Sequence, residues 1–318
     1  MRSRAARRLL DVGRQAAALD LLQIYGSSVA GTEHQQERAG LIADGLEQLA
    51  QRTEADPEVG VLSQHDISEL LGYLSRAGRP VERLARLEWM YLGTLGFNAN
   101  PVALRRLLAS DPDFFADVIA QVYRPERGDD RANGDADGDA EDSAEDAAQS
   151  ADRVRIQAEH AHRLLMAWRV LPGSREDGSV DFGALSAWVT RVRDRLKGLS
   201  RLRVGDTHIG HVLAWSPPDD NGIWPAKPVR DLLEVLQSED VEIGMRSQLF
   251  NNRGPWTRDL FEGGDQERGL SAKYRKQAGK SVDRWPRTAA VLRSLAESYE
   301  SLGRGEDDDA ERTHRGLR

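Results

Sequence analysis

The sequence predicts an all-α protein in which antiparallel helical hairpins stack as an irregular α-solenoid-like array, with a disordered acidic loop and a loop-rich C-terminal half. The first observation behind this prediction is that apolar residues recur at spacings of three and four along most of the 318 residues, as one helix face requires. The second is that short polar turns with glycine or proline separate these segments. The composition agrees, because 39% hydrophobic and 30% charged residues suit helices that bury a single stripe.

Residues 1–125 read as successive helices joined by short turns, and we expect them to form a helical-hairpin array. Ser63 is followed three residues later by Asp66, a spacing that resembles a capping box. Asp111 directly before Pro112 indicates another helix start. We find no strict internal repeat, so no named repeat family is indicated.

Residues 126–152 differ sharply from their surroundings in composition. Glycine, aspartate, glutamate and alanine dominate, and almost no aliphatic side chain larger than alanine is present. Such a segment buries too little apolar surface to offset the entropy lost on ordering. We therefore predict a disordered acidic linker, in which much of the acidic excess of the chain is concentrated.

Residues 153–303 are expected to form a second helical region. Glycines and prolines are frequent in the stretch 200–265, so we expect irregular loops there, with short helices around 207–215 and 226–250. A final helix is predicted from about 284 to 303, and the tail 304–318 is expected to be charged and frayed. The apolar seam of that final helix comprises Trp285, Ala289, Leu292, Leu295, Tyr299 and Leu302.

Composition and charge exclude several function classes. The chain has no cysteine, which excludes disulfides, thiol nucleophiles and cysteine-ligated metals. Its net charge of −8 disfavours nucleic acid and anionic lipid as partners. No apolar stretch approaches the roughly 20 residues that a membrane span needs, and the N-terminus has no signal-peptide core. We therefore expect a cytoplasmic protein without a membrane partner.

The segment Gly279-Lys280-Ser281 resembles the end of a phosphate-binding loop. That motif requires a glycine where Tyr274 stands, because glycines let backbone N–H groups approach the phosphates. No buried strand precedes the segment. We interpret it as a helix end, with Gly279 as a C-cap and Lys280 near the helix dipole, and we expect no cofactor.

The acidic run also imitates a calcium-binding loop. With Asn133, Asp135 and Asp137 at positions one, three and five, Gly138 falls correctly at position six. Position twelve is then Ala144, where a bidentate glutamate is needed. A solvated low-complexity loop is the better interpretation.

His208 and His211 lie three residues apart, directly after Asp206. On a helix the two imidazoles share a face, so they could supply two ligands of a metal site. No third ligand can be named and no glutamate stands in the zincin arrangement. Structural histidines are the default interpretation, and we predict no metal ligand set.

Unusual residues gather in the stretch 206–268. Arg253 and Arg258 near Trp256 could form an anion-binding or stacking surface; the alternative is a compact core in which indoles fill space and arginines pair with acids. We favour the alternative modestly. The candidate binding residues of this region are His208, His211, Trp224, Asn251, Asn252, Arg253, Trp256 and Arg258.

Five segments resemble the helical C-terminal part of large bacterial proteins that have no assigned activity. These segments are Leu87 to Leu92, Asp113 to Pro125, Gly205 to His211, Asn252 to Gly254, and Arg284 to Pro286. The resemblance covers nearly the whole chain, but its motifs are not mechanistic. It implies a helical module that normally follows a larger catalytic or sensor region.

We therefore expect a non-enzymatic helical scaffold that binds a protein partner, within a bacterial regulatory or conflict system. One alternative is a nucleic-acid-binding protein that uses local arginine-rich surfaces, against which the net charge argues. The other is an unrecognised metal-dependent enzyme centred on His208 and His211.

Overall fold

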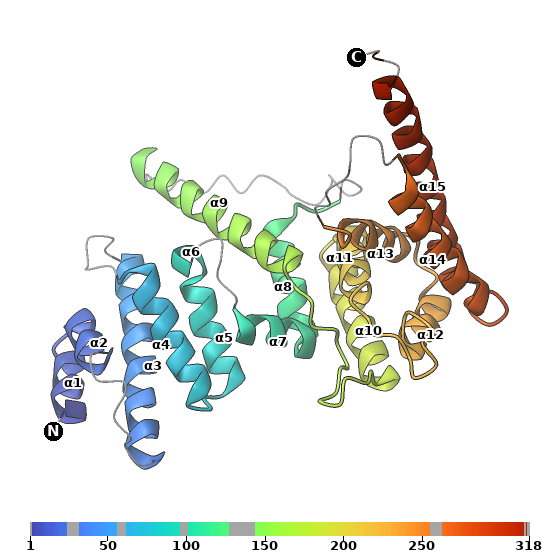
Figure 1. The fold of residues 1–318 in the computed structure, drawn as a ribbon. Helices are drawn as coiled ribbons and strands as arrows, with labels where there is room; N and C mark the ends of the chain where they lie inside the picture. The colour runs from blue at the N-terminus through green and yellow to red at the C-terminus, as the bar shows by residue number, and fades with distance from the viewer. Residues whose placement is uncertain are drawn as a thin grey trace. The chain divides into compact units, whose positions relative to one another are not determined.

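The computed structural model of the chain confirms the all-α prediction. It describes residues 2–23, 32–55, 62–95, 101–126, 144–254, 263–314 and 316 (Figure 1). Within these ranges all regular structure is helical, apart from one isolated bridge between Ser174 and Val180. No helix in the described ranges is both long and apolar enough to cross a membrane.

The chain divides into two compact units. Unit 1 comprises Met1–Leu108 with Ala140–His160, and unit 2 comprises Ala109–Asp139 with Ala161–Arg318. The helices up to the middle of the chain are α1 (Arg2–Asp11), α2 (Gln15–Gln23), α3 (Thr32–Ala55), α4 (Gln64–Arg76), α5 (Val81–Met90), α6 (Leu92–Leu95), α7 (Val102–Ser110), α8 (Pro112–Val122) and α9 (Ala144–Met166). The remaining helices are α10 (Phe182–Gly198), α11 (Leu202–Leu213), α12 (Lys227–Leu236), α13 (Glu239–Asn251), α14 (Asp265–Ser281) and α15 (Pro286–His314).

Unit 1 is held together by an aliphatic core and by a buried carboxylate. Leucine and isoleucine side chains of α2 to α7 form the core, among them Leu19, Ile42, Leu46, Ile67, Leu74, Leu87 and Leu104. The buried Glu88 of α5 accepts hydrogen bonds from the backbone N–H groups of Ala103 (3.3 Å) and Leu104 (2.7 Å). These are the donors that the first turn of α7 leaves without an intrahelical partner. A carboxylate at this position is also favoured by the helix dipole.

Carboxylates also accept hydrogen bonds from the N-termini of helices in unit 2. Glu234 of α12 accepts from the backbone N–H groups of Arg287 (3.0 Å) and Thr288 (3.1 Å) at the start of α15. Glu126 accepts from the N–H of Arg203 in the first turn of α11 at 2.7 Å. Several helices therefore have their N-termini fixed by an acid that is distant in sequence, in addition to local caps such as the confirmed capping box of Ser63 and Asp66.

The start of unit 2 differs from the predicted domain boundary. The sequence placed α8 with the first array, up to residue 125, whereas α8 belongs to unit 2. The physical reason is an aromatic cluster in which the ring of Phe115 lies 5.4 Å from that of Trp168 and 5.1 Å from that of Trp188. Asp113 of α8 also pairs with Arg191 of α10 at 3.1 Å.

Glycines in the described part of the stretch 200–265 serve as packing points between its helices. A Cβ atom on Gly210 would lie 2.1 Å from the carbonyl oxygen of Val241, and one on Gly244 would lie 2.1 Å from that of Thr207. The backbones of α11 and α13 therefore touch where these glycines meet. The short helices expected around 207–215 and 226–250 are present as α11, α12 and α13, where tertiary contact outweighs the low helix propensity of glycine.

The C-terminal hairpin also extends beyond its predicted end. Figure 1 shows α14 and α15 side by side, and α15 continues to His314 through the segment that we expected to fray. Asp307 accepts from the backbone N–H of Gly264 at 2.8 Å and pairs with Arg268 of α14 at 2.5 Å. These contacts hold the additional turns of α15 against α14.

The predicted acidic linker 126–152 is helical in its last part. Residues 127–143 lie outside the described ranges, while 144–152 are the beginning of α9. Alanine, glutamate and glutamine in these positions are good helix formers. Their composition therefore permitted a helix where the lack of large apolar side chains indicated disorder.

Candidate functional site

The two histidines singled out in the sequence meet a tyrosine and a third histidine. His208 and His211 lie on α11, and their rings contact edge-on with centroids 5.0 Å apart. The hydroxyl of Tyr123, at the end of α8, lies 2.8 Å from Nε2 of His208 and 3.1 Å from Nδ1 of His162 on α9. This histidine–tyrosine cluster thus joins the end of α8, the last part of α9 and α11, and all of its residues lie in unit 2.

The number of protons on the Tyr123 hydroxyl limits how the cluster can form hydrogen bonds. A phenol has one proton, so the Tyr123 hydroxyl donates to one imidazole and accepts from the other. Burial lowers the pKa of His208 to about 3, with smaller contributions from His211 and His162. Burial likewise lowers the pKa of His211 and raises that of Tyr123. His208, His211 and Tyr123 are therefore neutral at physiological pH.

This arrangement predicts acid sensitivity that depends on His208. In the unfolded chain a histidine titrates near 6.5, so between that pH and about 3 protons bind the unfolded state in preference to the folded one. The stability that neutral His208 contributes is therefore fully present above about pH 6.5 and is lost as the pH falls. The free energy of unfolding decreases by about 2 kcal/mol between pH 7.5 and pH 5 for this reason. We expect His208→Gln to lose about 2 kcal/mol less than the wild type over this interval, measured by urea unfolding at both pH values. Equal losses in the two proteins would contradict the expectation.

The cluster does not form a recognisable metal site. Among the described residues, no group of three or more histidine, aspartate or glutamate side chains is arranged to hold a metal ion. Nε2 of His208 instead faces the hydroxyl of Tyr123. The sequence did not indicate Tyr123 as the partner of His208, from which 85 residues separate it, or His162 as the second partner of Tyr123.

The other candidate residues occupy separate environments. Trp224 donates from Nε1 to the carbonyl oxygen of Ser216 at 2.7 Å and packs on the core around Ala278. Asn252 ends α13 and accepts from the amide of Gln248 at 2.7 Å. Trp256 and Arg258 lie outside the described residues.

Arg253 forms a buried ion pair with Glu267. Its guanidinium lies 2.6 Å from the carboxylate of Glu267, and the two side chains are 9% and 1% exposed. The ring of Tyr299 lies beneath the guanidinium, 5.9 Å from its central carbon to the ring centroid. This matches the interpretation in which the arginines of this region pair with acids, and Arg253 does not present its charge to an external anion.

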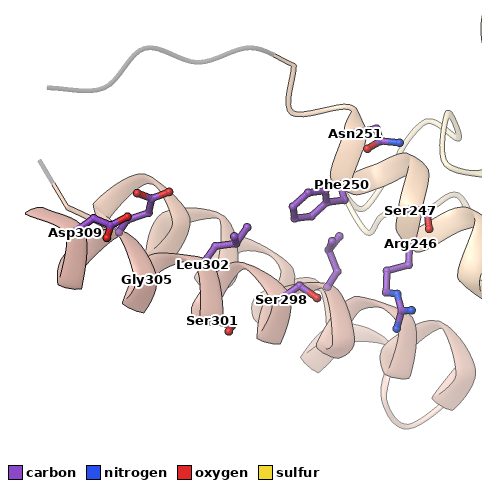
Figure 2. Close-up of a pocket in the computed structure, with 11 residues that line it drawn as sticks. Arg246, Ser247, Phe250, Asn251, Ser298, Ser301, Leu302, Gly305 and Asp309 are labelled. Atoms are coloured by element: carbon purple, nitrogen blue, oxygen red, sulfur yellow. The ribbon is translucent and has the colours of Figure 1, made fainter. Parts of the chain in front are cut away.

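Asn251 lines an open groove between α13 and α15, with a volume of about 700 Å³. Figure 2 shows Phe250 of α13 and Leu302 of α15 on the two sides of its middle, with Arg246 and Asp309 toward opposite ends. Phe250 and Leu302 are each 37% exposed. The lining residues are Arg246, Ser247, Phe250, Asn251, Leu295, Ser298, Ser301, Leu302, Gly305, Glu306 and Asp309.

The groove is lined mostly by residues that the sequence did not indicate as candidates for binding. Of the six candidate binding residues in the described ranges, only Asn251 lines it. Leu302 was expected in the buried seam of the last helix, where the other five seam residues are indeed buried. The sequence signal that points to the groove is the position of Leu302 at the end of the apolar seam. In the structure the seam continues beyond the helix that covers it, so Leu302 is exposed.

Comparison with known proteins gives no further guidance: no family model, no curated protein and no solved structure matches the chain significantly.

Proposed function

We propose that this chain is a non-enzymatic helical module that binds a segment of another protein in the groove between α13 and α15. The observation that carries the proposal is the open groove of about 700 Å³ with half-exposed Phe250 and Leu302 at its middle. Apolar side chains exposed side by side on two packed helices are typical of surfaces that receive the apolar face of a partner.

The finer architecture belongs to the same proposal. Neighbouring helices pack as pairs within each unit, as α4 with α5 in unit 1 and α14 with α15 in unit 2. We propose that these pairs are the hairpins of an irregular solenoid-like array, a scaffold whose stacked helices leave grooves between them. A role in a bacterial regulatory or conflict system remains part of this proposal.

The electrostatics of unit 2 favour a protein partner over nucleic acid. A phosphate backbone is bound by arginines and lysines that are not neutralised. Arg191 and Arg195 instead pair with Asp113 and Asp117 on α8. Acidic Asp309 lines one end of the groove (Figure 2), where it would repel phosphate.

A displayed peptide library tests the proposal. The full chain is panned against random 15-residue peptides, and enriched peptides are measured by fluorescence anisotropy. We expect Leu302→Asp to weaken their binding about 10-fold or more, because a charge would replace a central apolar contact. Phe250→Ser serves as a second groove variant. Thermal unfolding of each variant shows that its fold is intact.

The matched control is Val235→Asp, which places the same charge on a 68% exposed valine of α12 outside the groove. This variant is expected to bind the enriched peptides as the wild type does. The proposal fails if no peptide is enriched, or if the enriched peptides bind Leu302→Asp and Val235→Asp equally well.

A further inference from the structure

The two ends of the groove carry opposite charge, and this feature says what kind of segment fits. We infer that the ligand is an amphipathic helix of about 15 residues that carries an acidic residue at one end, apolar residues in its middle and a basic residue at the other end. The acidic residue lies over Arg246 and the basic residue over Asp309. This inference rests on the proposed function and adds the chemistry of the partner.

Arg246 supplies the positive end. Its guanidinium donates to the hydroxyl of Ser294 at 2.7 Å, a neutral partner that orients the side chain without cancelling its charge. No carboxylate of the described chain pairs with Arg246. A guanidinium with donors to spare binds a carboxylate in a two-point geometry, so this end selects an acidic residue.

Asp309 of α15 supplies the negative end. It lines the groove at the end opposite to Arg246 (Figure 2). Asp309 lies 3.4 Å from Arg312, but both side chains are about 70% exposed, and such a pair neutralises little charge. A lysine or arginine of the ligand is therefore favoured here.

The walls of the groove favour a helical ligand. Both walls are α-helices, whose backbone N–H and C=O groups are already paired within each helix. They offer no strand edge to which an extended peptide could add. A helix satisfies its own backbone and presents only side chains. From Ser294, beside Arg246, to Asp309 the axis of α15 rises roughly 22 Å, which corresponds to about 15 residues of a bound helix.

Three synthetic helical peptides test this polarity. All carry the apolar stripe of the best enriched peptide, and they differ only in their ends: acid and base, base and base, or acid and acid. We expect the wild-type chain to bind the acid-and-base peptide about 5-fold more tightly than the other two. Arg246→Glu is expected to reverse this order in favour of the base-and-base peptide. Asp309→Lys, an exposed substitution, is expected to shift the preference toward the acid-and-acid peptide.

The control is Lys276→Glu on α14, which makes the same charge change on an exposed residue outside the groove and should keep the wild-type order. Equal affinity of the wild type for all three peptides would overturn the inference while leaving the proposed function standing. The inference would also be overturned if neither Arg246→Glu nor Asp309→Lys changed the order of preference among the three peptides. If the library yields no enriched peptide, the proposed function and this inference both fail.

Discussion

Alanine at Gly210 or at Gly244 is expected to destabilise unit 2 by at least about 3 kcal/mol. At Gly210 the added methyl group would lie 2.1 Å from the carbonyl oxygen of Val241 and 2.6 Å from the backbone nitrogen of Met245. At Gly244 it would lie 2.1 Å from the carbonyl oxygen of Thr207. Backbone atoms cannot rotate away as a side chain can, so the methyl group forces α11 and α13 apart.

The helix separation reaches further than the two glycines. His208 and His211 share α11 with Gly210, so a shift of α11 also strains the bond of His208 to Tyr123. We expect the apparent Tm to fall by about 6–12 °C, measured by circular dichroism, together with a lower urea midpoint. Because two backbones are involved, the loss is expected to exceed that of a typical overpacked core position.

Glycines of α14 provide the matched control. A Cβ atom on Gly269 or Gly279 would meet no atom within 4 Å. Alanine there removes only the backbone entropy cost of a helical glycine and is expected to stabilise the protein by up to about 1 kcal/mol. If Gly210→Ala unfolded at the same urea concentration as Gly279→Ala, the close crossing of α11 and α13 would be refuted.

The contrast between these glycines explains what the sequence could and could not predict about the fold. Glycine lowers helix propensity wherever it stands, so Gly210 and Gly279 look alike in the sequence. Only the partner helix distinguishes a packing contact from an exposed position. The helix starts at Ser63 and at Asp111 were predictable, because each cap joins residues two or three positions apart.

Candidate sites were less predictable for a related reason. The pairing of His208 with Tyr123 spans 85 residues, and no local pattern encodes it. The groove depends on where α13 stops covering α15, so that Leu295 is buried while Leu302 is 37% exposed on the same seam. Periodicity places both leucines on one face, whereas burial is decided by the neighbouring helix.

The buried pair of Arg253 and Glu267 yields the second large effect that we expect. Glu267→Gln would remove the carboxylate that lies 2.6 Å from a guanidinium only 9% exposed, at a cost of about 3–5 kcal/mol. Arg253→Met would leave a carboxylate that is 1% exposed without its cation, at a similar cost. Both losses arise because an ion removed from water retains its desolvation penalty when its partner is gone.

A double variant separates this cause from simple loss of contacts. In Arg253→Met/Glu267→Leu neither charge of this buried pair remains, and apolar side chains fill much of the same space. We expect this protein to be more stable than either single variant, since replacing a buried ion pair by apolar groups is often neutral. Urea unfolding of the four proteins completes the double-mutant cycle. If the double loss equalled the sum of the single losses, the two side chains would act independently, and Arg253 would again be a candidate for binding an external anion.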